Sequence, residues 1–208
     1  MDWVKVAFVG DSHVFKLATQ WAKEADDKRR GTDIRVFGRG GARLVYEDGT
    51  TFQDIYFDRV VAWKPDLIVV WIAGNDLNQN LVTGAYVQRH YNTVFEQYIT
   101  LCDNFRASAR RWGGRVMMMP QLPRDVLWYT MTYNQFFDQV RCFNRKFKRR
   151  HIGANRVYMQ SGMFKNATCR DGVHLLPCKY EIIAQDLYDR YVMPIIRRRV
   201  WITYGYVY

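Results

Sequence analysis

Residues Val4–Ala18 read VKVAFVGDSHVFKLA, and their pattern changes halfway along. Val4–Val9 is an apolar run typical of a buried strand, whereas the residues after His13 have the apolar spacing of a helix. Glycine allows the chain to turn sharply between the two, and Ser12 falls where the helix should begin. The stretch therefore predicts a strand, a tight turn and a helix.

The alternation of strands and helices continues along the chain. Runs such as Leu67–Ile72 have no polar residue at alternate positions, so both faces of these strands should be buried, as in a parallel sheet covered by helices. The predicted strands are Val4–Val9, Ile34–Phe37, Leu67–Ile72, Val116–Met119 and Arg156–Met159. The predicted helices are Val14–Lys28, Phe52–Trp63, Ala85–Trp112, Tyr133–Arg150 and Lys179–Arg197. This order indicates the α/β class with a doubly wound sheet.

Length and composition indicate one globular domain. The 208 residues contain no internal repeat or low-complexity linker, so we expect a single domain over residues 1–200 and an aromatic tail over 201–208. No apolar run reaches the ~18 residues of a membrane span. Asp2 and Lys5 interrupt the start of the chain, which does not resemble a signal peptide. We therefore expect an intracellular protein, cytoplasmic or nuclear.

The four cysteines have no spacing typical of a metal site, and no metal is predicted. Cys169 and Cys178 flank a short loop, and their redox state is left open.

The chain carries a net charge of +11, with cations clustered in residues 141–150 and 197–199. Two interpretations stay open. In the first, the clusters are solvated helix faces and helix C-termini, where cations suit the helix dipole. Alternatively, they form a surface that binds RNA, DNA or anionic lipid. The oligomeric state is not predicted.

Four short polar motifs fall where functional groups collect in such a sheet, at the carboxyl ends of strands or just before the last helix. Each alone has an ordinary explanation as a helix cap or a turn. Together they supply a nucleophile, a base, an orienting carboxylate and oxyanion donors, which is the inventory of an acyl-transfer site. The motifs are Gly10–His13, Gly38–Arg43, Ala73–Asp76 and Asp171–His174.

The residue types suggest how such a site would work. Ser12 at a helix N-terminus suits a nucleophilic hydroxyl, because the helix dipole favours developing negative charge. Asp171 and His174 are three residues apart and can share one face of a turn. The carboxylate would fix the imidazole tautomer and leave the other nitrogen to take a proton from Ser12. A backbone N–H of the glycine-rich loop and the Asn75 amide could stabilise an oxyanion.

In this order and spacing the motifs resemble the SGNH (GDSL) hydrolase superfamily over nearly the whole chain. The resemblance implies a flavodoxin-like, three-layer α/β/α fold with a five-stranded parallel sheet. It implies a serine esterase that cleaves short-acyl or lipid carboxylic esters and needs no cofactor. The implied roles are Ser12 as nucleophile and N–H donor, Gly41 as backbone donor, Asn75 as side-chain donor, His174 as base and Asp171 as its orienting carboxylate.

Two positions depart from the family pattern. Ala73 stands in place of the first glycine of Gly-x-Asn-Asp, with Gly74 at the variable position. His13 replaces the leucine of GDSL, and we expect it to be a helix-start residue rather than a second base. The basic charge is similar to that of esterase domains in the first-open-reading-frame proteins of LINE-type retrotransposons, although many superfamily members are lipases, lysophospholipases or carbohydrate deacetylases.

Two other functions remain as alternatives. A binding module could retain the fold and act through its basic face, in which case its affinity should fall steeply with salt. A flavodoxin-like nucleotide binder is less favoured, because GDSH offers too few glycines or hydroxyls for a phosphate loop.

Overall fold

The computed structural model of the chain describes residues 3–25, 28–77, 91–124, 133–150 and 171–204. Within these residues, four parallel strands form one sheet in the order β2–β1–β3–β4. They are β1 (Val4–Gly10), β2 (Thr32–Gly38), β3 (Leu67–Trp71) and β4 (Arg115–Met118). Four predicted strands are thus confirmed, with ends shifted by one or two residues. The predicted fifth strand, residues 156–159, lies outside the described residues.

The central strands are buried on both faces, as their apolar runs predicted, whereas the edge strand β2 is only partly buried. Every residue of β3 is buried. Along β1, side chains alternate between two hydrophobic clusters, with Ala7 and Val9 in one and Val6 and Phe8 in the other. The core is therefore two apolar layers, one on each side of the strands.

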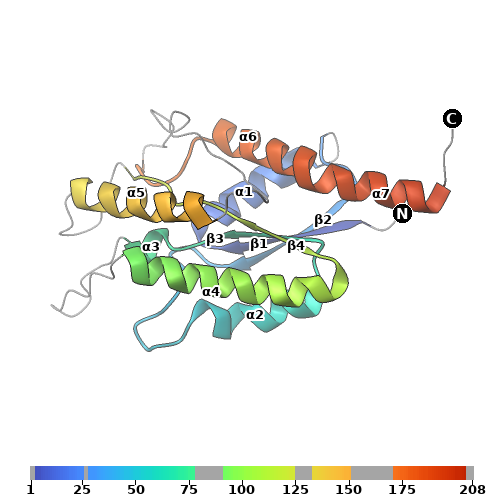
Figure 1. Cartoon of the computed structure of the whole chain (residues 1–208). Helices are drawn as coiled ribbons and strands as arrows, with labels where there is room; N and C mark the ends of the chain where they lie inside the picture. The colour runs from blue at the N-terminus through green and yellow to red at the C-terminus, as the bar shows by residue number, and fades with distance from the viewer. Residues whose placement is uncertain (1–2, 26–27, 78–90, 125–132, 151–170, 205–208) are drawn as a thin grey trace.

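Helices cover both layers and complete a three-layer α/β/α arrangement (Figure 1). On one face lie α1 (Ser12–Lys23), α6 (Pro177–Leu187) and α7 (Met193–Tyr204). On the other lie α2 (Phe52–Trp63), α4 (Tyr91–Ala109) and α5 (Tyr133–Arg150), with the short α3 (Gly74–Leu77) beside them. A 3₁₀ turn, η1 (Arg110–Trp112), extends α4. None of the described helices combines the length and apolar character needed to cross a bilayer.

The C-terminal helix differs from the prediction, which placed one helix over Lys179–Arg197. The structure has α6, a π-helical segment η3 (Tyr188–Val192), and then α7. Pro194 has no N–H to donate to the carbonyl four residues earlier, and a wider π turn is one way for a helix to absorb that loss. Because α7 continues to Tyr204, residues 201–204 of the predicted tail are helical.

The carboxyl ends of the strands lie very close together. Gly10 is in register with Gly38 on one side and with Trp71 on the other. The φ angles of Gly10 and Gly38 are +149° and +153°, which side-chain-bearing residues rarely adopt. A Cβ on Gly10 would lie 1.8 Å from the Trp71 carbonyl oxygen, and one on Gly38 would lie 1.8 Å from that of Gly10. Glycine is therefore required for the strands to converge at this edge.

The described cysteines, Cys102, Cys142 and Cys178, are free thiols. Cys169, the other member of the candidate pair with Cys178, lies outside the described residues.

Candidate active site

Ser12 is the first residue of α1, and it sits at the carboxyl edge of the sheet because β1 ends at Gly10. Asp11 caps the helix: its backbone is extended, and its Oδ1 accepts the His13 N–H at 2.9 Å. The cap fixes the first turn of α1 and presents Ser12 at the positive end of the helix dipole. The strand, turn and helix predicted from Val4–Ala18 are all present.

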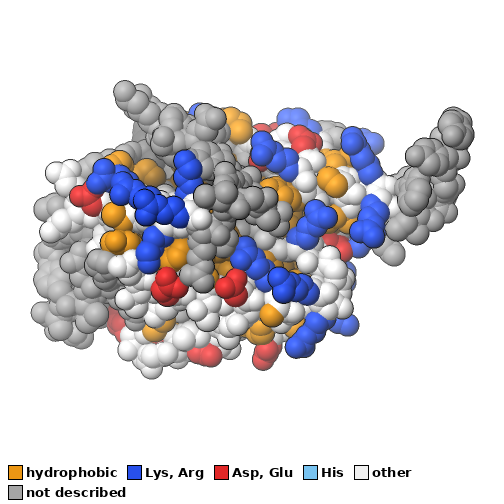
Figure 2. All heavy atoms as spheres, viewed as in Figure 1, with side chains coloured by type: hydrophobic (Ala, Val, Ile, Leu, Met, Phe, Trp, Pro, Cys, Tyr) orange, Lys and Arg blue, Asp and Glu red, His pale blue; other side chains and the backbone are white. Residues whose placement is uncertain are grey.

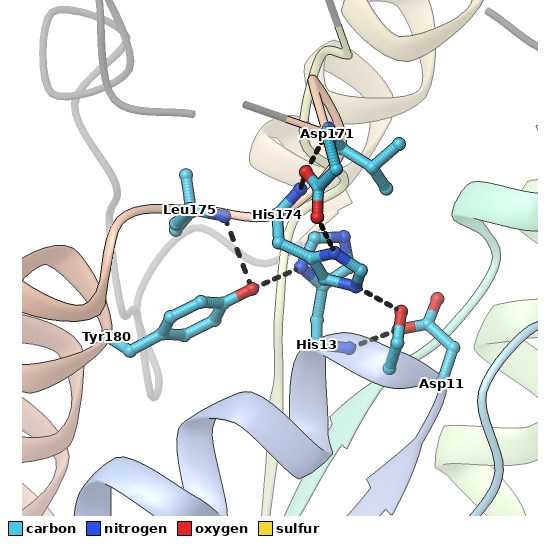
Figure 3. Close-up of polar contacts among 8 residues, drawn as sticks. Asp11, His13, Asp171, His174, Leu175 and Tyr180 are labelled. Carbon is cyan, nitrogen blue, oxygen red and sulfur yellow. Dashed lines mark hydrogen bonds and ion pairs between the residues drawn. The ribbon is translucent and has the colours of Figure 1, made fainter. Parts of the chain in front are cut away.

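Ser12 lies against His174, although 162 residues separate them in the chain. Ser12 Oγ is 2.7 Å from His174 Nε2, and His174 Nδ1 is 2.8 Å from Asp171 Oδ2. The backbone N–H groups of Val173 and His174 both donate to Asp171 Oδ1 at 2.9 Å. Figure 3 shows this chain of contacts above the first turn of α1. The structure thus brings together three of the five predicted site residues.

The charge on Asp171 determines the direction of these hydrogen bonds. Burial raises the pKa of the Asp171 carboxyl, but hydrogen bonds from His174 and Val173 outweigh burial and lower the pKa to about 2. An ionised carboxylate only accepts, so His174 Nδ1–H donates to it. In a neutral imidazole, Nε2 is then the acceptor for the Ser12 hydroxyl. This is the arrangement in which an imidazole can act as a general base toward serine.

The glycine-rich loop after β2 is tied to the motif after β3. The Ala42 carbonyl accepts from Asn75 Nδ2 at 3.0 Å, and the Leu44 N–H donates to both carboxylate oxygens of Asp76 at 3.0–3.1 Å. Gly41, immediately before Ala42, is exposed and has φ +71°. Of the two predicted oxyanion donors, Gly41 therefore lies in a loop that contacts the short helix α3, which carries Asn75.

Asn75 is held from both ends of its amide. Its Oδ1 accepts from Arg124 Nη2 at 3.0 Å, while Nδ2 donates to Ala42. A guanidinium only donates and a carbonyl only accepts, so the amide can satisfy both partners in one orientation alone. The second Nδ2 hydrogen makes no hydrogen bond among the described residues.

Ala73, just before this motif, adopts φ +109° and is fully buried. Glycine would adopt this conformation without strain, and holding a non-glycine residue there costs on the order of 1–3 kcal/mol. The departure from the family's first glycine thus places backbone strain beside Asn75.

His13 is in the first turn of α1, as predicted, and its side chain is buried. Its ring stacks on Trp71 with centroids 5.0 Å apart and lies 5.3 Å from the His174 ring. Its Nδ1 is 2.7 Å from Tyr180 Oη (Figure 3). Burial and the nearby Arg124 charge lower the pKa of His13 well below its usual value, so the ring is neutral. An enclosed imidazole with a lowered pKa is a weak proton acceptor, which supports the prediction that His13 is not a second base.

Asp11 and Arg124 are the site residues that the sequence reasoning missed. Asp11 is buried, and its Oδ2 has no hydrogen-bond partner in the described part of the chain. Burial raises the pKa of its carboxyl to about 6. Arg124 is buried although it is charged, and it follows β4 at the same edge of the sheet as the other motifs. In the sequence, the position of Arg124 after a predicted strand was the one feature that could have marked it as a site residue.

Two other features concern binding. The described residues contain no group of three or more His, Cys, Asp or Glu side chains that could hold a metal ion. A hollow of about 850 Å³ lies where β1 and β2 begin, at the edge opposite Ser12, and is therefore separate from the candidate site. The residues lining it are Trp3, Lys5, Thr32, Asp33, Ile34, Lys64, Asp66 and Arg199.

Residues 6–187 match the family model of GDSL-like lipases and acylhydrolases. Solved structures share the fold at low sequence identity. The lipase Lip_vut3 from a goat rumen metagenome is 17% identical over 90% of this chain and 98% of its own, with a TM-score of 0.59. Est24, a carbohydrate acetylesterase from Sinorhizobium meliloti, is 13% identical over 91% and 98%, with a TM-score of 0.59. An aryl esterase from M. smegmatis is 14% identical over 89% and 97%, with a TM-score of 0.54.

No curated protein matches the sequence significantly. None of the three structures is described as a retrotransposon protein, so that association remains a hypothesis.

Proposed function

This chain belongs to the GDSL-like lipase/acylhydrolase family, and from that premise we propose that it hydrolyses carboxylic esters through a Ser12–His174–Asp171 triad. Family membership supports ester hydrolysis in general. The observation that carries the specific proposal is the chain of contacts from Ser12 Oγ to His174 Nε2, at 2.7 Å, and from His174 Nδ1 to Asp171, at 2.8 Å. We include in the proposal that residues 1–200 act as one hydrolase domain.

In the proposed cycle, Ser12 Oγ attacks the ester carbonyl carbon while its proton moves to His174 Nε2. The tetrahedral intermediate collapses, and His174 returns the proton to the departing alkoxide, which leaves as an alcohol. The acyl group stays on Ser12. Water then attacks this acyl-enzyme with His174 as base, which releases the carboxylic acid and restores the serine.

The proposed oxyanion hole combines three N–H donors: the backbone N–H groups of Ser12 and Gly41 and the side-chain amide of Asn75. Ser12 supports this role through its place at a helix N-terminus, where the dipole favours negative charge. Gly41 and Asn75 support it because the Asn75–Ala42 hydrogen bond joins the glycine-rich loop to α3. Removing one such donor typically costs about 10²–10³ in turnover.

The substrate is proposed as a class. The structural relatives include a lipase, a carbohydrate acetylesterase and an aryl esterase, so short-acyl, sugar and lipid esters are all reasonable probes. A p-nitrophenyl ester series of increasing acyl length measures which length fits, because the leaving group stays constant while the acyl chain changes.

The test compares Ser12→Ala with wild type on p-nitrophenyl acetate. The variant should lose turnover by at least about 10³-fold, and the initial burst of p-nitrophenol from the acyl-enzyme should disappear. Ser108→Ala in α4 is the matched control, since it removes the same atom far along the chain and should keep full activity. Equal activity of Ser12→Ala and wild type would show that the triad proposal is wrong.

A second candidate function is binding of a polyanion through the basic face. Figure 2 shows Lys and Arg side chains gathered over α5 and near α7. Along α5, Phe136, Val140 and Phe143 are buried, whereas Arg145 and Arg149 are exposed. This role is compatible with esterase activity, because it uses a helix surface and not the triad.

A further inference from the structure

Arg124 is a buried cation in contact with Asn75, one of the proposed oxyanion donors. Its residue is 5% exposed, and its guanidinium packs over the Phe136 ring of α5 at 5.9 Å from the centroid. Burying a charged side chain is costly unless it is paired and hydrogen-bonded. Arg124 donates to Asn75 Oδ1 at 3.0 Å and experiences the charge of Asp11. A cation retained at this cost, in contact with a proposed oxyanion donor, calls for a functional explanation.

Gly74 provides the space for the guanidinium. A Cβ on Gly74 would lie 3.0 Å from Arg124 Nη2 and 3.5 Å from Gln121 Oε1. Gly74 has no positive φ, so its backbone conformation is open to any residue. Glycine at this position therefore allows Arg124 to approach the Asn75 motif. It is not required for a turn.

The contact with Arg124 acts on Asn75 in two ways. It excludes the flipped amide, because a flip would place the Nδ2 hydrogens against the guanidinium and Oδ1 against the Ala42 carbonyl oxygen. It also polarises the amide, since a cation donating to Oδ1 makes the Nδ2 hydrogens stronger donors at the other end.

We propose that Arg124 is a positioning residue of the oxyanion hole, which fixes and polarises the Asn75 amide and acts on the ester oxygen only through it. The inference rests on the proposed function, in which Asn75 donates to the oxyanion. Because the negative charge on that oxygen develops in the transition state, losing Arg124 should lower kcat and leave KM nearly unchanged.

The experiment is a double-mutant cycle on p-nitrophenyl acetate with wild type, Arg124→Met, Asn75→Ala and the double variant. Asn75→Ala should lower kcat about 10²–10³-fold and Arg124→Met about 10–10²-fold. If Arg124 acts through Asn75, the double variant should be no slower than Asn75→Ala alone. The proposal is wrong if kcat of the double variant is lower than that of Asn75→Ala by the full factor measured for Arg124→Met. It is also wrong if Arg124→Met leaves kcat unchanged.

Gly74→Ala tests the same point without removing the charge, and it carries the test if Arg124→Met does not fold. Its Cβ should displace the end of the guanidinium and lower kcat in the wild-type background but not in Asn75→Ala. Unchanged kcat in Gly74→Ala contradicts the proposal. Arg29→Met is the matched control, because Arg29 is also buried but pairs with Glu181, and it should change thermal stability without changing kcat.

The outcomes separate this inference from the function on which it rests. Activity that survives Ser12→Ala overturns the triad itself. Activity that needs Ser12 and Asn75 but tolerates Arg124→Met overturns only the role of Arg124.

Discussion

Asp11 has two oxygen atoms in very different surroundings. Oδ1 caps α1 by accepting the His13 N–H, whereas Oδ2 is buried without a hydrogen-bond partner in the described residues. Burial raises the pKa of this carboxyl to about 6, although the His13 N–H and the nearby Arg124 charge lower it and the Asp76 charge raises it. Because Asp11 precedes the proposed nucleophile, a buried acid and a buried cation both lie behind the site.

Asp11 should make the protein less stable as the pH rises. Its pKa is about 6 when folded and 3.8 when free, so the folded state holds this proton more tightly. The stabilising contribution is present below pH 4 and is lost between pH 4 and 6, by up to about 3 kcal/mol. Urea unfolding of wild type and Asp11→Asn at pH 4–7 measures it, because asparagine retains the cap but cannot ionise.

The informative quantity is the difference in the free energy of unfolding between wild type and Asp11→Asn. His13 contributes the opposite slope, since its neutral folded form loses stability as the pH falls below 6.5. His13 has this effect in both proteins, so it cancels in the difference. Asp103→Asn makes the same Asp-to-Asn change at an exposed position and serves as the control. A wild-type minus Asp11→Asn difference that is constant from pH 4 to 7 would contradict the assignment.

The sequence identified the site residues whose chemistry is visible in a local motif and missed those whose importance comes from burial. Ser12, Asp171 and His174 each stand in a short polar motif where a strand or helix begins or ends, and the fold brings them into contact. Arg124 is one of 31 lysines and arginines, and only the folded chain shows that it is buried against Asn75. Its role depends on packing between distant segments, which local patterns do not encode.

At the scale of elements, the ends of β1, β2 and β3 share one tightly packed edge. Gly10→Ala should lower the free energy of unfolding by about 3 kcal/mol or more, or prevent folding, because its Cβ would lie 1.8 Å from the Trp71 carbonyl oxygen. That oxygen belongs to the backbone of a central strand and cannot move aside. Chemical denaturation followed by far-UV circular dichroism measures the effect.

Gly40→Ala is the control for this prediction. Gly40 has no atom within 4 Å of an added Cβ and no positive φ, so its free energy of unfolding should change by less than about 0.5 kcal/mol. Equal stability of Gly10→Ala and Gly40→Ala would mean that the strand ends are less closely packed than the structure indicates.

Strand positions followed from apolar runs, and the four predicted strands that fall within the described residues are present. Helix ends were harder to predict, because they depend on single side chains. Asp11 caps α1, which begins at Ser12, two residues before the predicted Val14. Pro194 follows the π segment that interrupts the predicted last helix. The α2 helix ends at Trp63 as predicted, with Lys64 in the left-handed conformation before Pro65.

Over the whole molecule, the net charge is +11. The proposed esterase site of this family does not require a polyanion, so it does not explain that charge. The helix α5 concentrates this charge, with an apolar face against the core and cations toward solvent (Figure 2). Such a helix binds phosphates mainly by releasing their counterions, so affinity should depend steeply on salt. The esterase site and the basic face can thus be tested independently.

If the basic face binds single-stranded RNA, neutralising Arg145, Lys148 and Arg149 to glutamine should weaken binding and reduce the slope of log K against log salt by about 2, since each lost phosphate contact removes about 0.7. Fluorescence anisotropy with a labelled oligonucleotide at 50–300 mM NaCl measures both. Turnover of p-nitrophenyl acetate should stay unchanged, because these side chains lie on the exposed face of α5.

The matched variant neutralises Arg110, Arg111 and Arg115, which are equally exposed and lie around the start of β4. It removes the same charge from another place, so it separates a defined binding face from the general attraction of a basic protein for RNA. A larger loss in the α5 variant assigns the site to that helix. Equal losses would mean that net charge alone is responsible, and binding that does not depend on salt would rule out a phosphate-directed surface.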